Sequence, residues 1–361
     1  MKPGHEKLVE RMGGRKNQFD IIRFVAASLV VVTHAYAISL GHEDTEPFML
    51  VSSGQSTLGY LAVLVFFVTS GFLITMSFDR ASSLVYFLKA RILRIFPALL
   101  IIVLFTVFLL GPLMTSMDVR EYLSQQETYH YLRAIALWPM PYEMPGVFEG
   151  NVNQAIVNGS LWTLAYEFLF YLVVAMLGIM GILKKRVLIV TLFVITVLLS
   201  NFSLPIGGQT VELFSAFSSG MIFYLYRKEI PYHGGLALIS LVILGLTVQF
   251  GEFTIAFPIF GGYLTFYLAY MKSNHLFKFG KYGDFSYGIY IYGYPIQQVV
   301  TKQFGGSMDP YVNFLISYPI ILLFAYLSWH IVEKRSLKWK HRKVGLLKER
   351  NSRSASLAQT K

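Results

Sequence analysis

Arg23 and His34 are ionisable residues inside one long apolar stretch, FDIIRFVAASLVVVTHAYAIS, where polar groups are expensive and usually functional. Their spacing of eleven residues is close to three helical turns. Both side chains therefore project from nearly the same face, about 16 Å apart along the axis. A guanidinium near one membrane surface and an imidazole deep in the bilayer indicate a ligand path along this face. The alternative is an arginine that extends to the headgroups and a histidine packed against a neighbouring helix.

Two further arginines, Arg91 and Arg94, are three residues apart in the sequence KARILRIFPAL. On a helix they share one face, and two guanidiniums on one face suit bidentate recognition of phosphate. The alternative is ordinary anchoring of a membrane helix by basic residues at its cytoplasmic end. From these residues alone both interpretations stay open.

Glu167 lies about two turns inside the apolar stretch that begins NGSLWTLAYEFLFYL. A carboxylate at that depth must be paired, protonated or exposed to a wet cavity, so we expect a functional role for it. Trp162 and Tyr171 are its aromatic neighbours and are candidate cavity residues. Three other carboxylates border apolar stretches and are interpreted as ion pairs near the membrane surfaces: Glu212, Asp284 and Glu333.

Hydroxyl groups and glycine interrupt two more apolar stretches. Ser70 and Gly71 lie within LVFFVTSGFLITMSFDR, where small residues permit close helix packing and a hydroxyl can line a cavity. Ser286 and Tyr287 open the stretch SYGIYIYGYPIQQ, in which a proline ends or kinks the helix. We expect these hydroxyls to be available to a substrate within the bundle.

The composition indicates a membrane around these residues. Hydrophobic residues form 55% of the 361-residue chain and charged residues only 14%, whereas a soluble domain carries about 25% charged residues. A soluble enzyme is thereby nearly excluded. The chain has no cysteine, which removes disulfides, cysteine-ligated zinc and a thiolate nucleophile, and we expect no metal site.

Ten apolar stretches predict an all-α, polytopic membrane helix bundle. We place the transmembrane helices near residues 21–40, 58–77, 95–114, 160–183, 187–201, 211–226, 235–250, 255–271, 285–304 and 311–332. Residues 1–20 are then an N-terminal tail and residues 21–332 the transmembrane domain. Its one large loop covers residues 115–159. A basic tail of residues 333–361 follows, which we expect to be disordered beyond Lys348.

The basic residues predict the orientation of this bundle. With both termini in the cytoplasm, 27 of the 31 lysines and arginines fall on the inner side, as the positive-inside rule requires. The net charge of +11 is therefore mainly a topology signal, and we expect no nucleic-acid partner. A polybasic cluster next to the last span is expected to contact anionic lipid: Lys338, Lys340, Arg342 and Lys343.

Together these segments resemble integral membrane acyltransferase family 3, whose members O-acylate, and mostly O-acetylate, cell-surface carbohydrates of bacteria. The resemblance covers residues 19–335. The matching motifs are the Arg23–His34 pair, residues 66–72 (FFVTSGF), 91–97 (RILRIFP), 159–167 (GSLWTLAYE), 217–220 (FSSG), 286–290 (SYGIY) and 328–334 (SWHIVEK). Each motif alone is weak, but their order and their fit to the predicted topology are specific. Two positions depart from the family pattern: Gly293 stands where a histidine is usual, and Arg335 where a proline is usual.

The resemblance implies acetyl-CoA as the acyl donor in the cytoplasm, a carbohydrate hydroxyl as the acceptor outside, and a place in the bacterial inner membrane. It implies no tightly bound cofactor. Arg91 and Arg94 would bind the phosphates of coenzyme A, and Arg23 would guide the donor's entry. His34 would act as general base or carry the acetyl group, and Glu167 would assist it. The other candidates would line the substrate cavity: Ser70, Trp162, Tyr171, Ser286 and Tyr287.

Two other functions compete with this interpretation. A secondary transporter could use intramembrane His34 and Glu167 as a proton relay, although the chain has no visible repeat of interrupted helices. The second competing function is a membrane scaffold without catalytic activity, because Gly293 replaces the histidine that is usual in the family. The acceptor also stays open among lipopolysaccharide O-antigen, exopolysaccharide, exported oligosaccharide and peptidoglycan, either free or lipid-linked.

Overall fold

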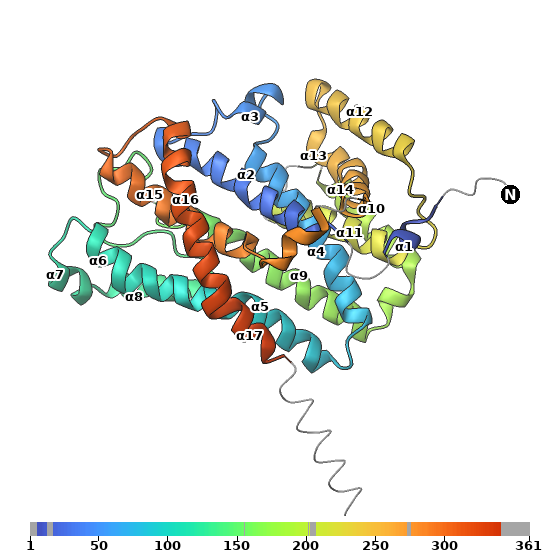
Figure 1. Cartoon of the computed structure of the whole chain (residues 1–361), viewed down its shortest axis with the longest axis horizontal. Helices are drawn as coiled ribbons and strands as arrows, with labels where there is room; N and C mark the ends of the chain where they lie inside the picture. Colours follow the sequence, from blue (N-terminus) through green and yellow to red (C-terminus); the bar gives the residue numbers. More distant parts are fainter. Residues whose placement is uncertain are drawn as a thin grey trace, which may run out of the picture.

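The computed structural model describes residues 6–12, 17–154, 156–200, 202, 207–272 and 276–340. These residues form helices joined by turns and loops, with no β-strand among them, so the all-α prediction is confirmed (Figure 1). The longer helices are α2 (Phe19–Leu40), α4 (Leu58–Asp79), α5 (Leu84–Phe105), α9 (Trp162–Ile179), α10 (Arg186–Leu199), α11 (Gly208–Leu225), α12 (Gly234–Phe250), α14 (Gly262–Ala269), α15 (Ser286–Gln303) and α16 (Pro310–Ser328).

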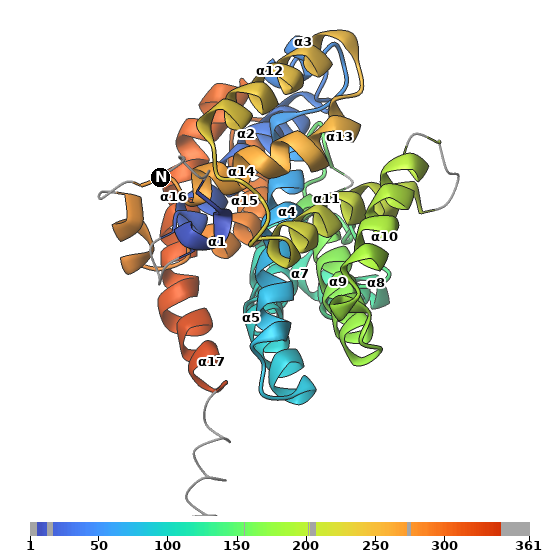
Figure 2. The ribbon, with the colours of Figure 1, turned by 90° about the vertical axis from the view of Figure 1, so that its right-hand side faces the viewer.

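Shorter helical turns extend or connect these elements. They are α1 (Leu8–Arg11), α3 (Pro47–Val51), η1 (Thr106–Leu110), α6 (Gly111–Met114), α7 (Val119–Ser124), α8 (Gln126–His130), η2 (Tyr131–Ala136), η3 (Gly159–Leu161), η4 (Ile182–Lys184), α13 (Phe253–Ala256), η5 (Phe257–Gly261), η6 (Leu276–Lys281), η7 (Trp329–Glu333) and α17 (Lys334–Lys338). Helices α16 and α17 lie on one side of the bundle and α9 and α10 on the other, with α4 between them (Figure 2).

A helix occupies each of the ten segments that the apolar stretches predict. Five are long and apolar enough to cross a membrane: Phe19–Leu40, Leu58–Asp79, Leu84–Met114, Gly159–Ile179 and Pro310–Lys338. Three are apolar but shorter, namely Arg186–Leu199, Gly234–Phe250 and Phe253–Ala269. Helices α11 and α15 complete the set. The protein is therefore a helical membrane protein with several spans.

Two helices are longer than the sequence analysis places them. The helix predicted to begin at residue 95 begins at Leu84 instead, where the Ser83 side chain accepts a hydrogen bond from the backbone N–H of Tyr86. The last helix runs without a break through the π-helical turn η7 to Lys338. As a result Arg91 and Glu333, which border the predicted spans, both lie on helices inside the bundle.

Glycine allows the closest helix contact in the centre of the bundle. A Cβ atom at Gly71 of α4 would collide with the backbone carbonyl of Phe217 in α11, and one at Gly220 of α11 would collide with the carbonyl of Val68. Small residues that let two backbones approach are typical of membrane helix interfaces. The packing interpretation of Gly71 is thus what the structure shows.

The loop over residues 115–159 has a structure of its own. It contains α7, α8 and η2, and the rings of Tyr122 and Tyr131 are fully buried in it. Asn151 donates to Gln298 of α15 at 2.7 Å, and Asn158 donates to the carbonyl of Ile291 at 2.9 Å. These buried amides attach the loop to α15.

The segments that the sequence predicts to lie on the cytoplasmic side contact one another. Leu8 and Tyr232 join the N-terminal segment to the turn after α11 through backbone hydrogen bonds, and Gln18 donates to the carbonyl of Met271. Lys89 at the start of α5 donates to the carbonyl of Trp339. Of the predicted lipid-contacting cluster, Arg342 and Lys343 lie outside the described residues, as does the tail beyond Lys348.

Candidate active site

A cavity of about 280 Å³ lies inside the bundle, where α2, α4, α5, α9 and α15 meet η7. Eight residues proposed from the sequence line it: Arg23, Ser70, Arg91, Arg94, Glu167, Tyr171, Ser286 and Tyr287. They come from five helices, α2, α4, α5, α9 and α15. The fold therefore brings most of the candidate residues to one place, with a mixed polar and apolar wall typical of ligand sites.

Asp284 joins two of the three cavity arginines. Its Oδ2 atom accepts from Nη1 of Arg23 at 3.0 Å and from Nη2 of Arg94 at 2.6 Å. Its Oδ1 atom accepts from the hydroxyl of Ser286 at 2.5 Å, and from the backbone N–H of that residue at 3.3 Å. Burial acts to raise the pKa of the Asp284 carboxyl, but the two guanidiniums and Ser286 hold that pKa well below its usual range. Asp284 is thus an ionised link between α2, α5 and the start of α15.

Glu333 holds the other end of the Arg94 guanidinium. Its Oε2 atom accepts from Nη1 of Arg94 at 3.1 Å, and its Oε1 atom accepts from Ser328 at 2.9 Å. The Glu333 side chain is only 2% exposed. It lies in the π-helical turn η7, and such turns often occur at functional sites. The same turn supplies Trp329 to the cavity wall.

Arg91 differs from its two neighbours, because no carboxylate of the described residues lies within ion-pair distance of it. Its guanidinium lies 5.7 Å from the ring centre of Tyr171 and 6.0 Å from that of Phe87, and its Nε atom is buried without a hydrogen-bond partner. Glu167, also in the cavity, accepts a short hydrogen bond from the Tyr171 hydroxyl. Arg91 is consequently the cavity cation that is available to an anionic ligand.

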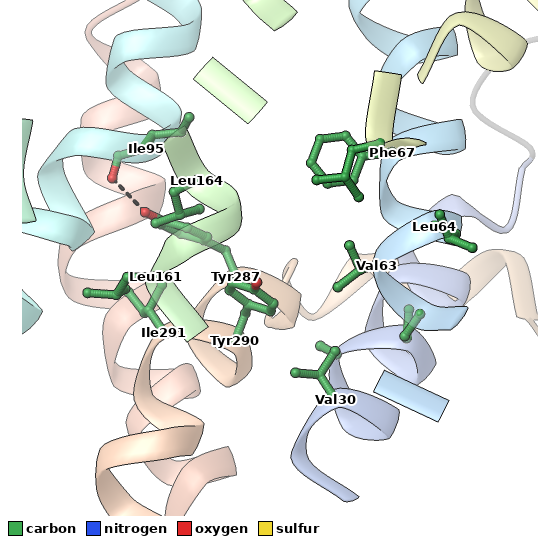
Figure 3. Close-up of a cluster of buried hydrophobic side chains, with 14 of the residues drawn as sticks. Val30, Val63, Leu64, Phe67, Ile95, Leu161, Leu164, Tyr287, Tyr290 and Ile291 are labelled. Carbon is green, nitrogen blue, oxygen red and sulfur yellow. Dashed lines mark hydrogen bonds between the residues drawn. The ribbon is translucent and has the colours of Figure 1, made fainter. Parts of the chain in front are cut away.

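Two hydroxyl-bearing residues of the cavity wall, Thr163 and Tyr290, contact each other. The hydroxyls of Thr163 on α9 and Tyr290 on α15 share a short hydrogen bond, and both residues are buried. Phe66 of α4 packs edge-on against the Tyr290 ring at 6.0 Å. In Figure 3, Tyr290 lies in a cluster of buried side chains that also contains Val30 and Val63.

His34 and Trp162 do not line this cavity. His34 packs edge-on against Tyr294 at 4.9 Å, one helical turn beyond Tyr290 on α15. Its Nδ1 atom is buried without a hydrogen-bond partner, yet the side chain as a whole is partly exposed. Trp162 packs against Tyr166 instead. The histidine therefore lies outside the cavity, against Tyr294.

Gly293, which departs from the family pattern, faces the helix that carries this histidine. A Cβ atom added there would meet Cγ2 of Val31 at 3.1 Å and no other atom within 4 Å outside its own surroundings on α15. Val31 is one turn before His34 on α2. A side chain at position 293 would therefore press against Val31, one turn from the histidine.

Sequence reasoning understated four cavity residues. The sequence predicts Asp284 only as an ion-paired residue near the membrane surface, whereas in the structure it binds two cavity arginines. Thr163, Tyr290 and Trp329 also line the cavity and had not been proposed as site residues. Helical spacing indicates two of these residues, Thr163 and Tyr290. Thr163 is one turn before Glu167, and Tyr290 is one turn after Ser286.

The fold and the cavity define a multi-span helical membrane protein with a cavity that three arginines line. Comparison with known families makes the class specific. The acyltransferase domain family matches residues 16–330. The chain belongs to this family, acyltransferase family 3, and is an acyltransferase.

Two curated relatives agree with this membership. An O-acetyl transferase of Shigella phage Sf6 is 31% identical over 345 residues, which cover 92% of this chain and 99% of that protein. Nodulation protein 10 of Rhizobium leguminosarum bv. viciae is 35% identical over 180 residues, which cover 46% of each chain. No solved structure matches the chain.

Proposed function

We propose that the protein is an O-acetyltransferase of the bacterial inner membrane. It moves an acetyl group from cytoplasmic acetyl-CoA to a hydroxyl of a cell-surface or exported carbohydrate, such as lipopolysaccharide O-antigen, exopolysaccharide or an oligosaccharide, free or lipid-linked. The ten helices cross the membrane with both termini in the cytoplasm. Family membership and the name of the phage relative support acetyl transfer over transport.

One observation carries the proposal. Three guanidiniums line one cavity, Arg91 among them has no carboxylate partner in the described part of the chain, and His34 lies three turns from Arg23 along α2. Arginine recognises phosphate through paired N–H donors. An anionic donor held at the arginine end would extend its acyl arm along the cavity toward the histidine.

The chemistry follows from this arrangement. His34 takes the proton of the acceptor hydroxyl, the hydroxyl oxygen attacks the thioester carbonyl, and the carbon–sulfur bond breaks. The coenzyme A thiolate leaves and takes up a proton, so the products are an acetyl ester and free coenzyme A. A transient acetyl-histidine is the alternative route to the same products. A thiolate relay is excluded because the chain has no cysteine.

Within the cavity, the candidate residues take different parts. Arg91 binds a phosphate of the donor, while Arg94 and Arg23 are held in place by Asp284. Glu167 is bonded to Tyr171, and no hydrogen bond joins it to His34 among the described residues. We therefore assign Glu167 to the cavity wall beside the acyl arm. At the surface, Lys338 and Lys340 face anionic lipid.

The first test is acetylation of the surface glycan in cells that carry His34→Ala, at a membrane protein level matched to the wild type. We expect the acetylated glycan to be lost in mass spectra of the purified glycan. Acetylation at the wild-type level in that variant would refute the assignment of His34.

The second test is acetyl-CoA binding to purified Arg91→Met. Loss of charge-assisted hydrogen bonds predicts an affinity about ten- to a hundredfold weaker. Arg186→Met is the matched control, because Arg186 pairs with Glu229 at the surface, away from the cavity. Equal affinities of the two variants would remove Arg91 from the donor site.

A further inference from the structure

The α2 face that carries Arg23 and His34 is blocked between them. Val30 is seven residues after Arg23 and four before His34, so all three side chains project from nearly the same face. Arg23 lines the cavity, but Val30 and His34 do not. Val30 is 3% exposed and belongs to the buried cluster in Figure 3. The cavity therefore ends before it reaches the histidine.

The two helices opposite this face supply the closure. On α15, Tyr290 lines the cavity and Tyr294, one turn further, contacts His34. On α9, Glu167 and Thr163 both line the cavity, with Thr163 one turn closer to the closed end. The hydrogen bond between Thr163 and Tyr290 therefore spans the cavity at the level where it stops.

We propose that the Thr163–Tyr290 pair is a gate between the donor cavity and His34. The gate is closed in this structure, and it must open before an acyl group in the cavity can reach the histidine. Thr163 and Tyr290 are positioning residues in this role, because they control the passage and do not take part in bond changes. The inference rests on the proposed function for its purpose, but the closure itself is a property of the bundle.

Physical reasons favour a hydroxyl pair for this role. A neutral side-chain hydrogen bond shifts an equilibrium by only about fivefold, so the closed state is preferred without being locked. Opening requires a rotation of the Tyr290 side chain away from Thr163, and such gating motions are common in enzymes that exclude water. A closed gate keeps water on the histidine side away from a bound thioester, which would otherwise be hydrolysed.

The natural absence of cysteine permits a direct test. Val30→Cys places a single thiol immediately behind the gate, and its reaction with a small anionic methanethiosulfonate reagent is timed on the full-length protein in nanodiscs. We expect slow labelling. Adding Tyr290→Phe or Thr163→Val, each of which removes the same hydrogen bond, should accelerate labelling about fivefold. The double variant should be no faster than either single variant.

Two controls identify the cause of any change. Ser70→Cys, in the cavity itself, should label rapidly with or without the gate substitutions. Tyr287→Phe also removes one hydroxyl from α15, but that hydroxyl donates to the carbonyl of Ile95 rather than to the gate. It should leave the labelling rate of Val30→Cys unchanged.

Rapid labelling of Val30→Cys behind an intact gate, or equal rates with Tyr290→Phe and with Tyr287→Phe, would overturn the proposal. Because no donor is present, this result is independent of whether acetyl-CoA is the substrate. Failure of the proposed function would appear instead as absent donor binding with the labelling pattern intact.

Should the cysteine variant not fold, the rate at which free coenzyme A is released from acetyl-CoA without acceptor gives a second measurement. This rate should rise about fivefold in Thr163→Val. An unchanged rate there would also refute the gate.

Discussion

Replacing Arg94 with methionine should destabilise the bundle much more than the same replacement at Arg91. The Arg94 side chain is 14% exposed and bonds to Glu333 at 3.1 Å and to Asp284 at 2.6 Å. Methionine keeps a similar stem but leaves the 2%-exposed Glu333 carboxylate without its cation. Ser328 then remains its only side-chain partner among the described residues.

The magnitude follows from this loss. Removing one partner of a buried ion pair costs about 3–5 kcal/mol, because the remaining charge stays buried and uncompensated. Arg91 has no carboxylate partner among the residues that the structure describes, and its methionine variant loses mainly its contacts with the two rings, about 1 kcal/mol. In thermal unfolding, we expect Arg94→Met to lower Tm by on the order of 5–10 °C, and Arg91→Met by much less.

The assay is thermal unfolding of both purified variants in one detergent, followed by size-exclusion chromatography. Glu333→Gln in the Arg94→Met background should restore part of the lost stability, since it removes the buried negative charge while keeping an acceptor for Ser328. Equal Tm values for Arg94→Met and Arg91→Met would refute the division of the arginine pair into a structural and a ligand-binding member. So would a further loss of stability on adding Glu333→Gln.

Two other substitutions test the framework around the site. Gly71→Ala should destabilise the protein by about 1–3 kcal/mol, because its methyl group collides with the Phe217 carbonyl, whereas Gly245→Ala, with open space at its Cβ, should not; thermal unfolding of both variants measures the difference. Glu46→Gln should lower Tm, because the fully buried Glu46 carboxylate accepts hydrogen bonds from Thr33 and from three backbone N–H groups. A wild-type Tm for Glu46→Gln would contradict that role.

The positions of the helices were predictable from the sequence because apolar length is a strong signal. The start of α5 was not, because the apolar stretch begins only near residue 95 and the basic residues before it, Arg91 and Arg94 among them, are typical of the cytoplasmic end of a span. A helix tolerates both arginines here because its neighbours supply carboxylates and aromatic rings. That compensation comes from α9, Asp284 and η7, which are far away in sequence, so no local pattern could reveal it.

The candidate site was predictable as a set of residues but not as an arrangement. Family motifs and buried charges pointed to Arg23, Arg94 and Ser286, and the structure joins these three through Asp284. Helical spacing placed His34 on the face of Arg23, which is correct for α2. It could not show that Val30 and the side chains opposite it close the path between them.

The charges of the cavity explain why one arginine of the pair remains available. Three guanidiniums in an apolar bundle would repel one another and lose hydration, so most of their charge must be neutralised. Asp284 and Glu333 neutralise Arg23 and Arg94, and both carboxylates are held by serine hydroxyls. The carboxylate of Glu167 is hydrogen-bonded to Tyr171, and the ring of Tyr171 lies 5.7 Å from the Arg91 guanidinium. The ring stabilises the cation without occupying its hydrogen-bond donors, so these donors stay open to the phosphate of the proposed acyl donor.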